Sequence, residues 1–374
     1  MSTSAIIIPC YNRTDCLNRL LKSLNQANYE YEFDLVFSID YSGKNDVLKV
    51  CKDFCWTHGN KRIITHKKNI GLRANILSCG DLLLSEYERI ILLEDDLIVN
   101  DNFCSFAMKA AEFYEDNIEI GGISLYAYAK SEIGLFNFYP LKDEYDTYFM
   151  QWPSSWGQLW TRKQWTEFRN WLTLDYDFST SNIPDYVKQW KNSWKKFYLA
   201  YLVETNRYFV YPYFTFTIES FSSGTHVNKN TISSIFNTNS FIGSKYRFRD
   251  FKSSIRFKYD AFFQPIDKLI KIDNETLKVS FDLYGVKKQD NISSDYVITC
   301  QKCTNALIKY GFVKFPLELN IEENISGNIF SLVRKVDFIS KELTWRLKES
   351  LRIVFTGKDY FAIILNKIKQ KFHF

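Results

Sequence analysis

The eight residues Ile90-Ile-Leu-Leu-Glu-Asp-Asp-Leu97 carry the clearest structural signal in this chain. Four apolar residues followed at once by three acids are typical of a buried strand that ends at the edge of a sheet. The adjacent carboxylates of Glu94, Asp95 and Asp96 repel one another, so burying them without a cation is costly. A divalent metal that bridges to a diphosphate relieves this cost, and oxygen ligands suit Mg²⁺ or Mn²⁺. The alternative is that the acids only favour the N-terminus of a following helix.

The sequence on both sides of this run alternates between short apolar segments and helical patterns. We expect strands at 5–9, 33–39, 62–66, 90–93 and 120–125, and helices at 15–27, 47–56, 72–86 and 102–114. The first helix, for example, carries Leu17, Leu20, Leu21 and Leu24 at helical spacing. This alternation predicts an α/β fold with a Rossmann-like, mostly parallel sheet and helices on both faces.

Polar or small residues follow four of the expected strands. In open α/β sheets, ligands bind beyond the carboxyl ends of the strands. That rule selects the segments 9–13, 40–43, 69–75 and 94–96 as the edge of a binding site.

The rest of the chain has a different sequence pattern. Residues 140–228 are aromatic and less regular, and residues 229–374 combine strand-like runs at 277–283 and 295–299 with helical patterns near the end. We therefore expect a catalytic domain at 1–228, with a donor half at about 1–125 and an acceptor half at about 126–228. A smaller mixed C-terminal accessory region at 229–374 follows, and it ends in amphipathic helices.

Composition limits the class of protein. The net charge is +5, but residues 331–374 alone carry +6, so the remainder is close to neutral. This distribution predicts a local anionic partner for the C-terminal end and argues against a nucleic-acid-binding protein. The eight cysteines lie mostly in apolar stretches, and no N-terminal signal or run of about 18 apolar residues is present, so we expect a cytoplasmic protein.

Five motifs, in order along residues 4–228, resemble those of GT-A glycosyltransferases, especially bacterial family-2-like enzymes. Leu93–Leu97 resembles the acidic motif in the variant seen in N-acetylglucosaminyltransferase I. The other four are Ile6-Ile-Ile-Pro-Cys-Tyr-Asn-Arg13, Asn69-Ile-Gly-Leu-Arg-Ala-Asn75, Ser154-Ser-Trp-Gly-Gln-Leu-Trp160, and Tyr211-Pro with Ser223-Gly-Thr-His226. The resemblance implies a GT-A fold and transfer of a sugar from a nucleoside-diphosphate sugar, uridine-based, to a hydroxyl of a glycan or lipid-linked glycan. It also implies a role in bacterial surface polysaccharide synthesis.

The resemblance assigns donor contacts to the first three segments. Tyr11 would stack on the base, Asp40 would accept from the base or ribose, Arg73 would pair with phosphate, and Gly71 would allow close backbone approach. The full donor-binding set is Pro9, Tyr11, Asn12, Arg13, Asp40, Asn69, Gly71, Arg73, Asn75, Glu94 and Asp95. A packed loop tyrosine and a solvated arginine at the start of a helix are the structural alternatives for Tyr11 and Arg73.

The metal ligands follow from the same resemblance. Asp96 would bind the Mn²⁺ or Mg²⁺ ion directly, Asp95 would bind or orient through water, and Glu94 would hydrogen-bond the ribose. His226 occupies the place of a late histidine ligand, which suits Mn²⁺ better than Mg²⁺. A histidine in a surface turn is the alternative for His226.

Inverting transfer needs a carboxylate to remove the proton of the acceptor hydroxyl. We predict that Asp185 is this base, because it precedes Trp190 and Trp194 in the region where N-acetylglucosaminyltransferase I has an Asp ahead of a Trp. The competing acids are Asp143, Asp146, Asp175, Asp177 and Glu219. Relatives carry Asn-Phe-Gly-Asp where this chain has Glu219-Ser-Phe-Ser-Ser, so a retaining mechanism stays open.

Aromatic residues of the fourth motif are expected on the acceptor side. Trp152, Trp156 and Trp160 would stack on sugar faces, with Gly157 at a tight turn, and packing in the core is the alternative for each tryptophan. A sugar nucleotidyltransferase would share the sheet and the acids, but Cys10-Tyr-Asn-Arg13 lacks its glycine-rich phosphate loop. A non-catalytic sugar- or nucleotide-binding protein is the other alternative.

Two apolar stripes with four-residue spacing close the chain. The first comprises Leu343, Leu347, Leu351 and Phe355, and the second comprises Phe361, Ile364, Leu365, Ile368 and Phe372. Basic residues flank both, as in helices that lie on an anionic membrane surface. This pattern predicts peripheral binding to the inner face of the plasma membrane, and packing on the protein's own core is the alternative.

Overall fold

The structure is a computed structural model that describes residues 3–133, 136–172, 176–219, 243–272 and 275–339. The chain divides into two compact units, Met1–Phe263 and Gln264–Phe374. Unit 1 contains a nine-stranded and a two-stranded sheet, unit 2 contains a five-stranded sheet, and each unit is described by itself below.

The first part of unit 1 alternates strand and helix as the sequence predicts. Its elements are β1 (Ser4–Cys10), α1 (Thr14–Gln26), β2 (Asp34–Ile39), α2 (Asp46–Asp53), β3 (Lys61–Thr65), α3 (Gly71–Ser85), β4 (Arg89–Leu92), β5 (Leu97–Val99), α4 (Phe103–Phe113) and β6 (Ile120–Ser124). The short strand β5, directly after the acids, is an addition to the predicted elements.

The strand β1 lies between β2 and β4, and both neighbours run parallel to it. All of its seven residues are buried, which explains why its sequence reads as a continuous apolar run and not as an alternating one. The strand β3 extends the parallel arrangement beyond β2. Because these strands run in one direction, their carboxyl ends meet at one edge of the sheet.

The segment 140–219 is more regular than the sequence indicates. Its elements are β7 (Thr147–Met150), β8 (Gln158–Thr161), α5 (Arg162–Leu172), α6 (Asp185–Lys188), α7 (Trp194–Glu204), β9 (Tyr208–Pro212) and β10 (Thr217–Glu219). Strand β8 joins β4 and β6 through antiparallel pairing, and β7 pairs antiparallel with β9. Strands buried on both faces lose the alternating pattern, which is why the sequence did not resolve them.

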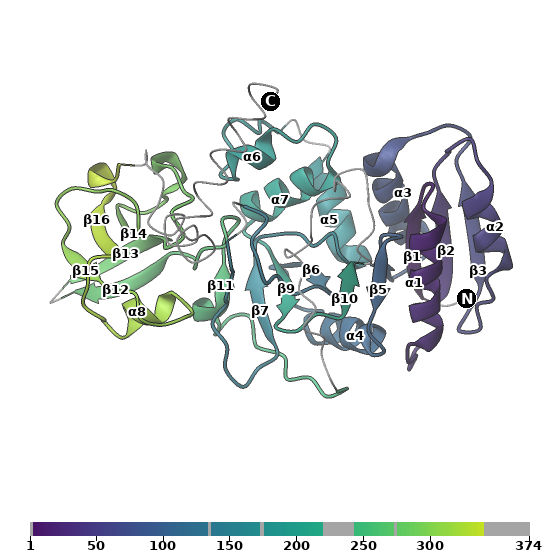
Figure 1. The fold of residues 1–374 in the computed structure, drawn as a ribbon, viewed down its shortest axis with the longest axis horizontal. Coiled ribbons are helices and arrows are strands. Elements are labelled where there is room, and N and C mark those ends of the chain that lie inside the picture. Colours follow the sequence, from purple (N-terminus) through teal and green to yellow (C-terminus); the bar gives the residue numbers. More distant parts are fainter. Residues whose placement is uncertain (1–2, 134–135, 173–175, 220–242, 273–274, 340–374) are drawn as a thin grey trace, which may run out of the picture. The chain divides into compact units, whose positions relative to one another are not determined.

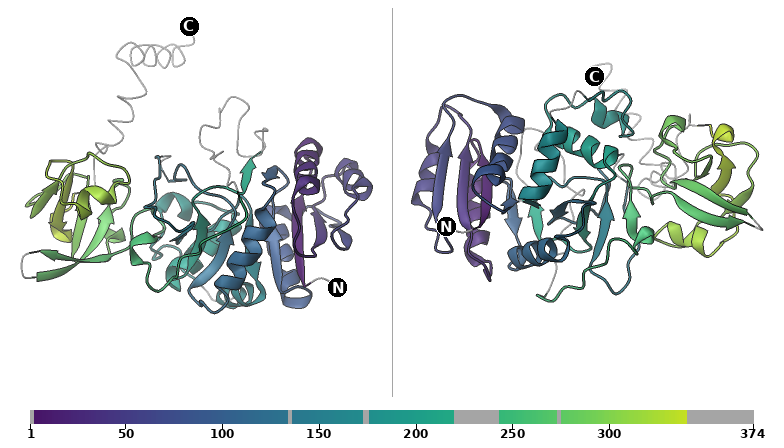
Figure 2. Two further views of the ribbon diagram at one scale, coloured as in Figure 1. Left: turned by 90° about the horizontal axis from the view of Figure 1, so that it is seen from below. Right: turned by 180° about the vertical axis from the view of Figure 1, so that it is seen from behind.

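The nine-stranded sheet of unit 1 has the order β11-β7-β9-β6-β8-β4-β1-β2-β3, where β11 is Lys258–Tyr259. Five of its eight strand pairs are parallel, so the predicted α/β fold with a mostly parallel sheet is confirmed. Helices α3, α5 and α7 pack on one another. Figures 1 and 2 show α5 and α7 on the opposite side of the sheet from α4.

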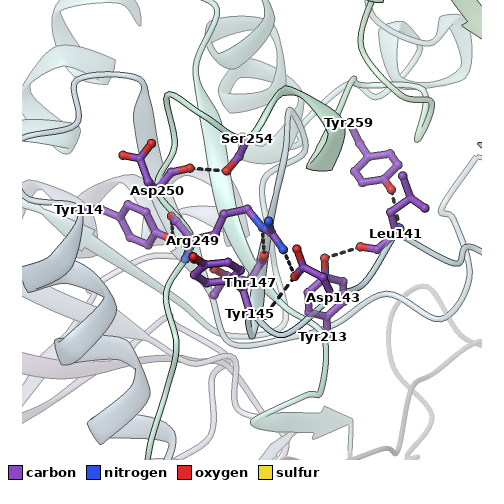
Figure 3. A network of polar contacts seen from close by, with 10 residues as sticks. All are labelled: Tyr114, Leu141, Asp143, Tyr145, Thr147, Tyr213, Arg249, Asp250, Ser254 and Tyr259. Carbon is purple, nitrogen blue, oxygen red and sulfur yellow. Dashed lines mark hydrogen bonds and ion pairs between the residues drawn. The ribbon is translucent and has the colours of Figure 1, made fainter. Parts of the chain in front are cut away.

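The segment 243–263 belongs to unit 1 because Arg249 fastens it to the edge of the sheet (Figure 3). Arg249 is 5% exposed, donates to the carbonyl of Thr147 at 3.1 Å, and forms an ion pair with Asp143. Its guanidinium also lies 3.4 Å from the ring centre of Phe257. The first unit therefore extends to Phe263, whereas the sequence-based boundary lies near 228, outside the described residues.

Unit 2 contains a five-stranded mixed sheet with the order β12-β13-β14-β16-β15. Its elements are β12 (Lys268–Ile272), β13 (Glu275–Asp282), β14 (Tyr296–Thr299), β15 (Ile308–Tyr310), α8 (Glu318–Glu322) and β16 (Phe330–Arg334). The expected strands at 277–283 and 295–299 are β13 and β14. The amphipathic helices expected after residue 340 lie outside the described residues.

None of the helices in the described part of the chain is long and apolar enough to cross a membrane.

Candidate active site

The acids after β4 lie beside the loop after β1, as the parallel pairing of these strands requires. Arg13 forms ion pairs with Asp95 and, at 2.6 Å, with Asp96. The side chain of Asp95 is 5% exposed and that of Asp96 14%. One guanidinium thus partly balances the charge of this buried acid cluster.

The remaining negative charge, together with burial, raises the pKa values of the acids. Burial raises the pKa of Glu94 to about 8, and the negative charge of Asp96 adds to this effect. Burial likewise raises the pKa of Asp95 to about 6, although the positive charge of Arg13 opposes the shift. A group that binds here and brings positive charge would stabilise the ionised forms.

Glu219 joins the acids from a distant part of the chain. It ends β10, which pairs antiparallel with β5 and places Glu219 opposite Leu97, one residue after Asp96. Glu219 is 6% exposed, and burial together with the charge of Asp96 raises its pKa to about 7. Glu219 was only one of several competing acids in the sequence, and the pairing of β5 with β10 is what brings it to the cluster.

Two carboxylate oxygens of this cluster are buried without a hydrogen-bond partner in the described structure, Asp96 Oδ1 and Glu219 Oε2. Within the described ranges, no three His, Cys, Asp or Glu side chains form a preformed metal site. The predicted ligand His226 lies outside the described residues. Unpaired, desolvated carboxylate oxygens are nevertheless the ligands that a hard divalent cation prefers, so the residues present fit Mn²⁺ or Mg²⁺.

Three of the predicted donor-binding residues have structural roles at the start of α3. Asp40 is buried, and its carboxylate accepts from the backbone N–H groups of Tyr41, Ile70 and Gly71 at 2.8 to 2.9 Å. Gly71 has a φ of +80°, a conformation that favours glycine, and a Cβ added there would meet nothing within 4 Å. The glycine is therefore required by backbone conformation.

Asn75 is 2% exposed and faces the interior, where its amide donates to the carbonyl of Ser38 at 3.1 Å and accepts from the Ser38 hydroxyl at 2.5 Å. It fastens α3 to β2. The other donor-side residues lie nearer the surface. Tyr11 is 42% exposed, and Arg73 lies 4.0 Å from the ring centre of Phe197. The remaining members are Pro9, which is buried in β1, and Asn12 and Asn69, which are exposed.

The predicted base, Asp185, begins α6 and has a 44% exposed side chain that pairs with Lys188 at 3.6 Å. Among its competitors, Asp143 pairs with Arg249, Asp146 accepts from the backbone of Arg247, and Asp177 caps a turn at Ser179. Asp175 lies outside the described residues. Glu219 is the candidate that the structure brings to the acids.

The predicted acceptor-side tryptophans differ in exposure. Trp152 and Trp160 are fully buried, and Trp160 packs against Trp165, Trp194 and Tyr198. Trp156 is partly exposed, so the acceptor-side prediction rests on it. Gly157 has a φ of +89° at the turn before β8.

A buried charged cluster near the acids gave no signal in the sequence. Lys195 on α7 is 5% exposed and pairs with Glu132 in the loop after β6. Its positive charge acts on Glu94, whose pKa it lowers slightly against the larger effect of burial. The two partners are 63 residues apart, and neither lies in a recognisable motif.

Residues 5–167 match the family model described as Glycosyl transferase family 2. This segment is similar to glycosyl transferase family 2 domains. The match begins in β1, contains the three acids after β4 and ends in α5, and it supports the predicted glycosyltransferase. Glu219 and Lys195 lie beyond the matched segment.

Solved structures also resemble the chain. TarS 1-349 of S. aureus, in complex with UDP-GlcNAc, has a TM-score of 0.41 at 14% identity, covering 60% of this chain and 60% of that chain. GalNAc-T7 with UDP, GalNAc and Mn²⁺ has a TM-score of 0.40 at 12% identity, covering 57% and 42%. The mannosyltransferase PcManGT from Pyrobaculum calidifontis, in complex with GDP-Man and Mn²⁺, has a TM-score of 0.31 at 11% identity, covering 46% and 47%. The chain thus spans 60% or less of each of these structures. No curated protein matches it.

Proposed function

We propose that this protein transfers a sugar from a nucleoside-diphosphate sugar to a hydroxyl of a glycan or lipid-linked glycan, with a divalent metal. The observation that carries the proposal is the buried acid cluster, whose three adjacent acids lie in the segment similar to family 2 domains, with its unpartnered oxygens on Asp96 and Glu219. The similarity of Leu93–Leu97 to the acidic motif of N-acetylglucosaminyltransferase I is part of the proposal.

Asp96 and Asp95 would hold Mn²⁺ or Mg²⁺, together with His226 as predicted from the sequence. When bound, the metal stabilises the negative charge that develops on the departing nucleoside diphosphate. The exposed ring of Tyr11 supplies a stacking face for the base, and a uridine base is proposed. Asp40 supports this region indirectly, because it fixes the backbone where the loop after β3 enters α3.

The general base is proposed to be Asp185 or Glu219. Asp185 is the residue that the motif similarity selects, and Glu219 is the acid that lies at the cluster. A base works best when its pKa lies near the operating pH, and the raised pKa of Glu219 meets that condition.

The experiment that tests the function is a donor screen by nucleotide release, with uridine, guanosine and thymidine diphosphate sugars and with Mn²⁺, Mg²⁺ or chelator. Calorimetry with the matching nucleoside diphosphate and Mn²⁺ should show binding that weakens in Tyr11→Ala and not in Tyr139→Ala, a tyrosine of similar exposure at 44%. Absence of binding to every nucleotide would end the transferase proposal. Release of pyrophosphate from a nucleoside triphosphate and a sugar phosphate would favour a nucleotidyltransferase, and nucleotide binding without turnover would indicate a non-catalytic protein.

The wider role proposed is bacterial surface polysaccharide synthesis at the inner face of the plasma membrane. It rests on the basic, apolar-striped sequence of 340–374, which lies outside the described residues. Full-length protein should sediment with anionic vesicles, and a variant that lacks 360–374 should not, while it keeps its transfer to a soluble acceptor. Failure of the full-length protein to bind such vesicles would contradict the membrane role.

A further inference from the structure

The cluster formed by Tyr128, Glu132, Trp152 and Lys195, which we name the Glu132 cluster, presents one carboxylate in a fixed orientation. Oxygen Oε1 of Glu132 accepts from Tyr128 Oη, from Trp152 Nε1 at 3.2 Å and from the ammonium of Lys195. Tyr128, Trp152 and Lys195 are all at least 95% buried, so three rigid donors fix this oxygen.

The second oxygen of Glu132 is different. It has no hydrogen-bond partner among the described residues, and it is not fully buried. The side chain of Glu132 is 17% exposed in total, so the free oxygen lies where another molecule can reach it. A carboxylate with one oxygen fixed and the other accessible is a preorganised hydrogen-bond acceptor.

Aromatic surface lies next to this carboxylate. The ammonium of Lys195 is 5.9 Å from the ring centre of the partly exposed Trp156, which also packs against Tyr126 and Tyr128. Tyr186, on α6, is 44% exposed and lies close enough for the charge of Glu132 to contribute to its raised pKa, after the larger effect of burial. A fixed carboxylate beside partly exposed rings suits a sugar, whose hydroxyls donate and whose C–H face stacks on an aromatic ring.

The charge of the neighbourhood decides which sugars fit. The charged side chains of the Glu132 cluster are Lys195 and Glu132, and they pair with each other. Lys195 is already paired with Glu132, so it offers little attraction to a phosphate or carboxylate on an incoming glycan. An anionic acceptor would therefore gain no ion pair from this cluster to offset the loss of its hydration, whereas a neutral sugar carries no such cost.

We propose that the Glu132 cluster is the acceptor subsite, in which the free oxygen of Glu132 accepts hydrogen bonds from hydroxyls of an uncharged sugar stacked on Trp156, and Lys195 is the positioning residue. The proposal rests on the proposed transferase function and adds to it the acceptor class, a neutral glycan end. Glu132 here binds the acceptor, and no proton transfer is assigned to it.

The test uses the full chain labelled with 5-fluorotryptophan, whose nine tryptophan signals are assigned with single Trp→Phe variants. The probes are methyl β-D-glucopyranoside and glucose 6-phosphate, which share a pyranose ring but differ in charge. We expect the neutral glycoside to shift the signals of Trp152 and Trp156 and to bind more tightly than the phosphate. Glu132→Gln should raise the dissociation constant at least tenfold, whereas Glu144→Gln, an exposed glutamate of the same unit, should change it less than twofold.

Lys195 is tested by rescue. Lys195→Met should weaken glycoside binding as Glu132→Gln does, and Lys195→Arg, which keeps the charge, should recover most of the affinity. Full affinity in Lys195→Met would show that Lys195 only fills space, and equal loss in both variants would show that its charge does not position Glu132; either outcome would overturn its positioning role.

Unchanged affinity in a folded Glu132→Gln protein, tighter binding of glucose 6-phosphate, or no signal shift at the solubility limit of the glycoside would each overturn the proposal. The charge preference is measured on the unsubstituted chain, so the test does not depend on Glu132→Gln being able to fold. Failure of the proposed transferase function gives a different result. In that case no donor releases its nucleotide, while the glycoside still shifts the two tryptophan signals.

Discussion

The buried acids of the two units differ in whether all of their carboxylate oxygens accept hydrogen bonds. In unit 2, Asp282 is 0% exposed, and both of its oxygens are saturated by donors from Val286, Lys287, Thr299 and Gln301 at 2.7 to 2.9 Å. In unit 1, Asp96 and Glu219 each keep one buried oxygen without a partner in the described structure. Burial raises the pKa of Asp282 as it raises that of Glu219, so burial alone does not distinguish the two.

The difference lies in what each acid can still bind. Asp282 closes the turn after β13, where Gly285 has a φ of +63°, and its four donors leave no capacity for a ligand. In unit 1, Glu219 comes from β10, and the other acids come from the loop between β4 and β5, where Arg13 is the ion-pair partner of Asp95 and Asp96. A buried acid whose oxygens all accept hydrogen bonds stabilises the fold. A buried acid with an unpartnered oxygen stabilises the fold less, and that oxygen remains available to bind a cation.

The sharpest test of this comparison is Asp96→Asn. If Asp96 holds the metal, transfer should fall by about four orders of magnitude, which corresponds to about 5.5 kcal/mol of transition-state stabilisation. The free energy of unfolding should change by less than about 1 kcal/mol, because the lost pairing with Arg13 is offset by reduced repulsion among the acids. Steady-state kinetics and urea unfolding measure the two effects.

Asp101→Asn is the matched control, since Asp101 is an exposed acid five residues further along the chain. Its activity should be within twofold of the unsubstituted protein. Near-normal turnover by a folded Asp96→Asn protein, or full activity in excess chelator, would contradict the metal site.

Asp282→Ala tests the other side of the comparison. It leaves four donors without this acceptor, and those of Lys287 and Thr299 are buried, so unit 2 should lose about 3–4 kcal/mol of stability. The urea midpoint followed by circular dichroism should shift accordingly, while Asp295→Ala, which removes an exposed carboxyl just before β14, should cost less than about 0.5 kcal/mol. Equal effects of the two substitutions would mean that the Asp282 network contributes little.

Much of this arrangement follows from local patterns in the sequence. The strands β1 to β4 and β6, with helices α1 to α4, were predicted because each combines a clear period with a turn or a polar end. The acid cluster at the end of β4 was predicted for the same reason, since an apolar run followed by acids is a local signal. Parallel pairing then brings the strand ends together without further information.

What the sequence did not show depends on contacts between distant residues. Glu219 reaches the acids through the antiparallel pairing of β5 with β10, and the Glu132 cluster joins two loops to α7. Asp40 and Asn75 were expected to contact the donor. In the structure, Asp40 accepts from the backbone at the start of α3, and Asn75, inside α3, bonds Ser38 of β2, because polar side chains near strand ends and helix starts can also bind the protein's own groups. Residue type and position in the sequence do not distinguish a residue that contacts the donor from one that forms a structural hydrogen bond.

The identity of the base is the next test, with a smaller expected effect. Asp185→Asn and Glu219→Gln should be compared for kcat at saturating donor, and the true base should lose about 100-fold, or about 2.7 kcal/mol. Retention of donor affinity distinguishes loss of a base from loss of a metal ligand, because only the latter weakens nucleotide binding in the presence of Mn²⁺. If both variants keep full kcat, neither residue is the base, and the anomeric configuration of the product would then show whether transfer is retaining.

The smallest expected effect is a thermal shift that should appear in one unit alone. A cation that binds only the folded acids stabilises unit 1 by RT ln(1 + [L]/Kd), which is about 1.4 kcal/mol at a concentration near tenfold Kd. We therefore expect Mn²⁺ to raise the melting temperature of unit 1 in the unsubstituted protein and in Asp282→Ala, and to leave it unchanged in Asp96→Asn. The saturated site at Asp282 has no free oxygen to offer, so calorimetry should show no metal-dependent shift in the transition that Asp282→Ala lowers. A metal-dependent shift of that second transition would break the comparison, because a carboxylate with four donors would then bind a cation as readily as one that keeps a free oxygen.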